Sequence, residues 1–136
     1  MENSKIYAVP LGRIFLSALF IWAGCTKLFV FGPAGTAGFF AKAGVPIPEL
    51  AAWIAIIVEL VGGILILIGW QARWTALALC IWCLITGFAY HLPATAMMHD
   101  MTHFYKNLGL AGGFLYIFAF GAGAFSLDRA MGTDKA

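Results

Sequence analysis

The sequence predicts an all-α integral membrane protein, in which four transmembrane helices form an up-down-up-down bundle. Three observations carry this prediction. Hydrophobic residues make up 62% of the 136-residue chain and charged residues make up 10%, and the mean hydropathy is +0.92. A soluble domain has about 25% charged residues, and eight basic and six acidic side chains cannot cover the surface of a small soluble fold.

The length limits the number of crossings. A transmembrane helix needs about 20 mostly apolar residues, so four helices fill roughly 80 residues and leave the rest for ends and loops. We therefore expect one membrane domain, residues 1–136, in contact with the lipid bilayer. The net charge of +2 gives no reason to expect nucleic acid as a partner.

Long apolar runs place the four spans at residues 7–31, 50–70, 74–90 and 107–127. Glycine and proline at both ends of residues 32–49 interrupt helices, so this connection is expected to be an external loop. Its middle, residues 39–42, could be a short interfacial turn or a re-entrant piece. Residues 91–106 are expected to form a second external loop. Four crossings put both termini on one side, which would carry five of the eight basic residues. This side is therefore predicted to be cytoplasmic.

Two charged residues lie well inside the predicted spans. Glu59 is near the middle of 50–70, and Lys27 is near the outer end of 7–31. Such residues cost a few kcal/mol in a bilayer unless they are paired or solvated. Side chains lean toward the N-terminus of their own helix, so Lys27 and Glu59 lean toward each other in antiparallel helices. We predict an ion pair, which either fixes helix register or lines a polar site.

Three further charged residues are expected at the cytoplasmic surface. Arg13 starts near that end of its helix, and its long side chain can extend to the surface. Arg73 and Asp128 fall at cytoplasmic span ends, where we expect them to anchor the helices and to pair.

The segment Cys80-Ile-Trp-Cys83 has the C-x-x-C pattern of redox-active thiols. An apolar span supplies none of the cations, metals or helix N-termini that activate a thiol. The two cysteines are therefore expected to be small core residues. Oxidation by a quinone that arrives through the lipid is the alternative, and the sequence leaves it open.

The loop 91–106 contains candidate metal ligands. Methionine and histidine together suit soft metals such as Cu(I), and His99 and His103 have the i, i+4 spacing that puts two side chains on one helix face. The alternative is an interfacial loop whose methionines contact lipid.

The last predicted span begins beside Lys106 and Asn107. His91 or Lys106 could hydrogen-bond a quinone carbonyl. Gly109 and Gly113 have the G-x-x-x-G spacing that lets helices approach closely, within the bundle or between copies of the chain.

Five short segments of the chain resemble those of a known family, namely Gly24-Cys-Thr-Lys27, Gly44-Val-Pro46, Glu59-Leu-Val-Gly62-Gly63 with Gly69 and Arg73, Lys106-Asn107, and Ser126-Leu-Asp128. In this order, they resemble the DoxX family of small bacterial inner-membrane proteins along nearly the whole chain. The cysteine pair and the Met/His loop are not part of this resemblance.

The resemblance implies a four-helix bundle in the cytoplasmic membrane and links the chain to quinone-dependent membrane redox complexes. It marks Lys27, Glu59, Arg73, Lys106 and Asn107 as candidate functional residues. We expect an accessory or quinone-proximal subunit with no tightly bound cofactor, whose electrons come from a protein partner or a soluble substrate. A non-enzymatic scaffold subunit and a metal-handling protein are the alternatives, and the sequence leaves open whether the chain is catalytic.

Overall fold

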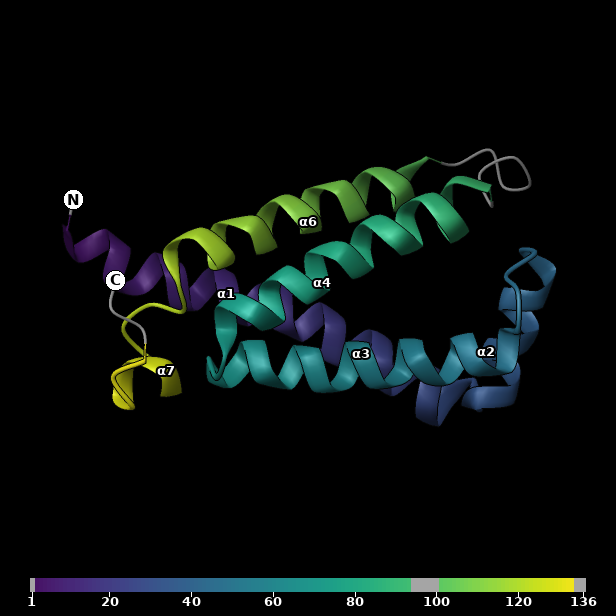
Figure 1. Cartoon of the computed structure of the whole chain (residues 1–136), viewed down its shortest axis with the longest axis horizontal. Coiled ribbons are helices and arrows are strands. Elements are labelled where there is room, and N and C mark those ends of the chain that lie inside the picture. The colour runs from purple at the N-terminus through teal and green to yellow at the C-terminus, as the bar shows by residue number, and fades with distance from the viewer. Residues whose placement is uncertain (1, 94–100, 134–136) are drawn as a thin grey trace.

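The structure, a computed structural model, describes residues 2–93 and 101–133, and this part of the chain forms a helical bundle without β-strands (Figure 1). Its long helices are α1 (Glu2–Cys25), α3 (Pro48–Ile68), α4 (Ala72–Thr86) and α6 (Thr102–Phe120). Two π-helical turns, η1 (Thr26–Val30) and η2 (Gly87–His91), extend α1 and α4. The short helices are α2 (Gly32–Lys42) and α7 (Leu127–Ala130).

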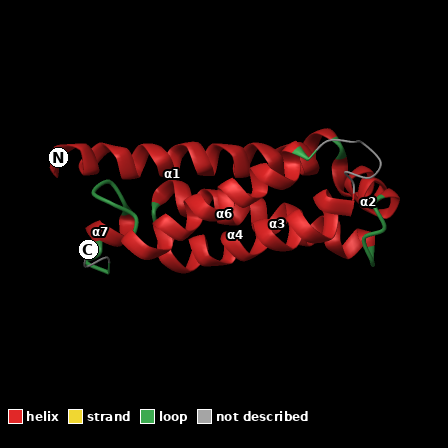
Figure 2. Ribbon diagram, turned by 90° about the horizontal axis from the view of Figure 1, so that it is seen from above, coloured by secondary structure: helices red, strands yellow, loops and turns green. Residues whose placement is uncertain are grey.

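The bundle consists of two helix pairs, because α1 packs mainly on α3 and α4 packs mainly on α6. Glycines bring the first pair together: a Cβ atom at Gly63 would lie 2.9 Å from Ile21, and one at Gly24 would lie 2.7 Å from Leu60. A hydrophobic core around Phe114, Leu79 and Ile66 joins the pairs. The start of α1 and the short helix α7 lie at one end of the bundle, and α2 lies at the other (Figure 2).

Three helical segments of the described chain are long and apolar enough to cross a membrane, namely Ile6–Val30, Pro48–Ile68 and Ala72–His91. They match the first three predicted spans closely, and the prediction of an all-helical chain is confirmed. The helix α6 is not among the three, because His103, Lys106 and Asn107 lower the hydropathy of its first turns.

The predicted ranges were wrong in two places. The expected span 107–127 is the helix Thr102–Phe120, and it ends early because Gly121 and Gly123 take positive φ angles of 84° and 80°. The expected loop 32–49 contains α2, an 11-residue helix with proline in its first turn. Proline is favourable there, since the first helical N–H groups need no partner, so the proline marks the start of a helix and not its absence.

Arg13 is buried, and the prediction that it reaches the cytoplasmic surface is wrong. Its side chain is 3% exposed and donates hydrogen bonds to the carbonyls of Ala122, at 3.0 Å, and of Phe125. These carbonyls belong to the non-helical segment between α6 and α7, which has no helical donors for them. Arg13 therefore fastens that segment to α1.

Arg73 and Asp128 each complete a helix end at this side of the bundle. The Arg73 guanidinium donates to the carbonyls of Phe118 and Ala119, at 2.8 and 2.7 Å, in the last turn of α6. The Asp128 carboxylate accepts from the backbone N–H groups of Gln71 and Ala72, both at 2.8 Å, where α4 begins. Both side chains thus satisfy backbone groups that a helix leaves without partners, and the expected pairing of Arg73 with Asp128 stays a prediction.

The glycines of α6 divide between two faces. A Cβ atom at Gly113 would lie 3.3 Å from Leu16, so Gly113 sits against α1. At Gly109 and Gly112, a Cβ atom would meet no neighbouring atom within 4 Å. One member of the G-x-x-x-G pair therefore serves packing within the chain, and association of copies through the other face stays a prediction.

Candidate functional site: a polar cavity at the α2 end of the bundle

A cavity of about 670 Å³ lies at the end of the bundle that carries α2. Its walls are mostly aromatic and aliphatic and include Phe20, Trp22, Phe39, Phe40 and Trp82. Polar groups interrupt these walls on opposite helix pairs. Those from α4, η2 and α6 are Thr86, Tyr90, His91, His103, Lys106 and Asn107, and those from the other side are Thr26, Lys27, Thr36 and Glu59.

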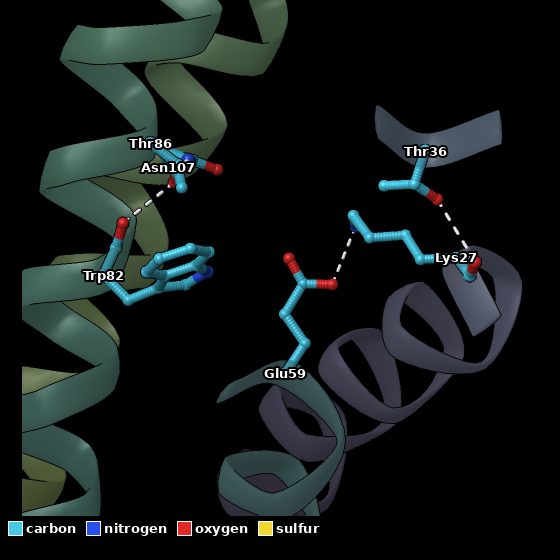
Figure 3. A network of polar contacts seen from close by, with 6 residues as sticks. All are labelled: Lys27, Thr36, Glu59, Trp82, Thr86 and Asn107. Atoms are coloured by element: carbon cyan, nitrogen blue, oxygen red, sulfur yellow. Dashed lines mark hydrogen bonds and ion pairs between the residues drawn. The ribbon is translucent and has the colours of Figure 1, made fainter. Parts of the chain in front are cut away.

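The ion pair predicted between Lys27 and Glu59 is confirmed and borders the cavity (Figure 3). The Nζ atom of Lys27 lies 2.7 Å from Oε2 of Glu59, and the side chains are 22% and 11% exposed. Glu59 faces the interior because Gly62 and Gly63, on the same face of α3, let other helices come close. The pair is thus shielded on the α1–α3 side and open toward the cavity.

A π-helical turn presents Lys27 to the cavity. Such turns contain one residue more than an α-helical turn and occur often at functional sites. The hydroxyl of Thr36, on α2, donates to the carbonyl of Lys27 at 3.2 Å (Figure 3). This bond satisfies a backbone acceptor of the turn η1 and fixes it against α2.

Asn107, on α6, holds the last turn of α4, directly before the second π-helical turn η2. The amide Nδ2 of Asn107 donates to the hydroxyl of Thr86 at 2.9 Å and to the carbonyl of Cys83 at 3.2 Å. Thr86 in turn donates to the carbonyl of Trp82 at 2.9 Å (Figure 3). Asn107 is 6% exposed, so this buried network sets the position of the helix directly before η2.

Beyond this network, His91, His103 and Lys106 form a group that we call the basic cluster. The rings of His91 and His103 stack with centroids 5.5 Å apart and planes 19° from parallel. The Nζ atom of Lys106 lies 3.4 Å from Nδ1 of His103. Since lysine can only donate, Nδ1 is the acceptor, and a neutral His103 ring then carries its proton on Nε2.

The predicted metal site at His99 and His103 stays a prediction, because His99 lies outside the described residues. Within the described part of the chain, no group of three or more His, Cys, Asp or Glu side chains could hold a metal ion. His103 instead stacks on His91 and lies beside Lys106, whose positive charge disfavours a cation at that nitrogen.

Cys80 and Cys83 are free thiols, 3% and 1% exposed, in the hydrophobic core. The interpretation as small core residues fits this burial. Cys83 also lies at the wall of the cavity. The alternative, oxidation of the cysteines by a quinone, therefore stays a prediction.

Of the five candidate functional residues and His91, the structure brings all but one to a single cavity. Lys27 and Glu59 lie on one side of it, and His91, Lys106 and Asn107 lie on the other. Arg73 is the exception, since it caps α6 at the opposite end of the bundle. The contributions of Thr36 and Thr86 were missed, because a hydroxyl that satisfies a helix carbonyl leaves no pattern in the sequence.

An all-helical chain with three apolar spans and a partly polar cavity is an integral membrane protein of the helical-bundle class. The DoxX family model matches residues 8–92, so the chain belongs to the DoxX family. It is 36% identical over 123 residues to the inner membrane protein YphA of Escherichia coli (strain K12), covering 88% of this chain and 86% of YphA.

The chain is also 36% identical over 129 residues to the inner membrane protein YqjF of the same organism, covering 95% of each chain. No solved structure matches. The family, these relatives and the candidate spans together place the chain in the inner membrane as a multi-pass protein.

Proposed function

We propose that this DoxX-family protein crosses the membrane four times, with both termini in the cytoplasm, and serves membrane redox metabolism as a quinone-binding subunit. The start of α1 and the helix α7 lie at the same end of the bundle (Figure 2), as an even number of crossings requires. The helix α6 packs along α4, and its core-facing residues Ala111, Phe114 and Ile117 are buried.

The cavity is the observation that supports a quinone. A quinone ring is flat and apolar, with two carbonyl oxygens that accept hydrogen bonds. The cavity offers aromatic walls, and it has donors on both sides, from Lys27 and from the basic cluster. Ligand sites commonly combine a mostly apolar lining with a few polar groups that orient the ligand.

The protein is not expected to supply electrons to the quinone by itself. The sequence contains no motif for a bound flavin, nicotinamide or haem, so electrons would come from a protein partner or a soluble substrate. We therefore assign to this chain the binding and orientation of the quinone. Electron delivery is assigned to another component of the complex.

The test is to purify the full chain in mild detergent and to identify co-purified quinone by mass spectrometry. Ala23→Phe adds a ring inside the cavity lining of α1, and Ala8→Phe adds the same ring at an exposed position of the same helix. We expect quinone to accompany the wild type and Ala8→Phe and to be lost from Ala23→Phe.

Two results would contradict this function. Absence of quinone from the wild type, together with no binding of added short-chain ubiquinone, would remove its basis. A stable protein partner with no bound small molecule would favour the scaffold subunit instead.

A further inference from the structure

We propose that the cavity takes its ring-shaped ligand as an anion, with an ionised ring hydroxyl bound at the basic cluster of His91, His103 and Lys106. The inference rests on the proposed quinone-binding function and narrows its ligand class. The preferred ligand is a quinone-type ring that carries a negative oxygen, and a neutral quinone binds less tightly.

The net charge of the cavity lining favours an anionic ligand. Among the described lining residues, Lys27 and Lys106 are the lysines, and Glu59 is the only acidic side chain. Lys27 holds Glu59 at 2.7 Å. This pair is neutral as a whole, so the charge of Lys106 is in excess within the lining even when both imidazoles are neutral.

Lys106 and His103 are exposed and lie beside the apolar walls of the cavity. Lys27 and Lys106 both lie close enough to His91 to act on it electrostatically, so the positive field extends along this side of the cavity. A ligand anion placed there removes the imbalance, whereas a neutral ligand leaves it.

Lys106 supplies hydrogen-bond donors for an ionised oxygen. Lys106 uses one N–H group toward Nδ1 of His103, at 3.4 Å, and an ammonium group has two more to donate. Nε2 of His103 lies on the side of its ring away from Lys106, so it donates to a different atom, and the ring is stacked on that of His91. An ionised hydroxyl accepts several such hydrogen bonds, and bonds to a charged acceptor are the stronger kind.

The experiment compares two probes with the same ring, 2-hydroxy-1,4-naphthoquinone and 2-methoxy-1,4-naphthoquinone. The hydroxyl of the first is ionised at pH 8, and the second is neutral. Binding to the purified full chain in detergent is measured by isothermal titration calorimetry. We expect the wild type to bind the anionic probe at least about tenfold more tightly than the neutral one.

Substitutions in the basic cluster test whether the preference for the anionic probe depends on it. Lys106→Gln should reduce it to less than about threefold by weakening only the anionic probe, and Lys106→Arg should retain it because the charge is kept. Lys42→Gln is the matched control, since Lys42 is exposed in the last turn of α2 and does not line the cavity. It should behave as the wild type does.

The outcomes separate this inference from the proposed function. Equal binding of both probes would overturn the anion preference and leave quinone binding standing. Binding of neither probe would overturn both. A preference that persists in Lys106→Gln and in His103→Gln would show that the anion binds elsewhere, which overturns the assignment to the cluster.

Discussion

The Nζ atom of Lys27 lies 2.7 Å from Oε2 of Glu59, and this contact joins the π-helical end of α1 to the middle of α3. The two side chains come from helices that pack directly on each other. Their charges cancel at the edge of the cavity, which makes the α1–α3 wall polar but neutral. The opposite wall, with the basic cluster, therefore determines the net charge that a ligand meets.

Reversing one charge of this pair should destabilise the fold, and reversing both should restore it. Lys27→Glu or Glu59→Lys alone is expected to lower the free energy of unfolding by about 3 kcal/mol, at the lower end for a broken buried pair because Lys27 is partly exposed. Denaturant titration followed by circular dichroism measures this. A double variant no more stable than either single variant would argue against direct pairing.

Replacing Asn107 should weaken the attachment of α6 to the turn before η2. Asn107→Leu removes the amide donor to the Thr86 hydroxyl and to the Cys83 carbonyl, which keeps its bond from the Gly87 N–H, at an expected cost of about 0.5–1.5 kcal/mol. Thr86→Val removes the other partner. A double-mutant cycle should give a coupling energy of at least about 0.5 kcal/mol, and strictly additive effects would show that the two residues act independently.

Gly69 should tolerate no side chain. It has a φ angle of 67° at the end of α3, and an added Cβ atom would meet the Arg13 guanidinium and the Ser126 side chain. Gly69→Ala is expected to lose about 1–3 kcal/mol from backbone strain alone. The control is Gly12→Ala in α1, where an added Cβ atom would meet nothing within 4 Å.

In that control, alanine should be neutral or should stabilise the helix by up to about 1 kcal/mol. Thermal unfolding of both variants in the same detergent gives the comparison. Equal stability of the two would mean that the end of α3 does not need its left-handed residue.

The three cysteines should react with a thiol reagent at rates that fall with increasing burial. Cys80 and Cys83 are buried and Cys25 is only partly buried, so N-ethylmaleimide should modify Cys25 first in the folded protein. Modification of the other two requires local opening, and each 1.4 kcal/mol of opening free energy slows it about tenfold. Peptide mass spectrometry over time follows each site, and early modification of Cys83 would show that the cavity admits reagents to α4.

The sequence predicts the apolar segments well, because the length and hydropathy of a span follow directly from the bilayer. It is less reliable where glycine and proline are frequent. Proline both interrupts a helix and starts one, so the pattern of residues 32–49 predicts a loop although α2 lies within them. The end of α6 at Phe120 was missed for a related reason, since Gly121 and Gly123 take backbone angles that the apolar pattern does not reveal.

The amino-acid sequence alone is enough to predict the class of protein, the three strongly apolar spans and the pairing of Lys27 with Glu59. An unpaired charge inside a membrane is unfavourable, so two opposite charges on adjacent spans are expected to pair. The packing of the helices was needed to show that His103 stacks on His91, that Arg73 lies far from the cavity and that Arg13 is buried. Spacing along one helix determines which residues share a face. The rotation of each helix about its axis, relative to its neighbours, depends on packing. In this protein, two π-helical turns change that rotation further.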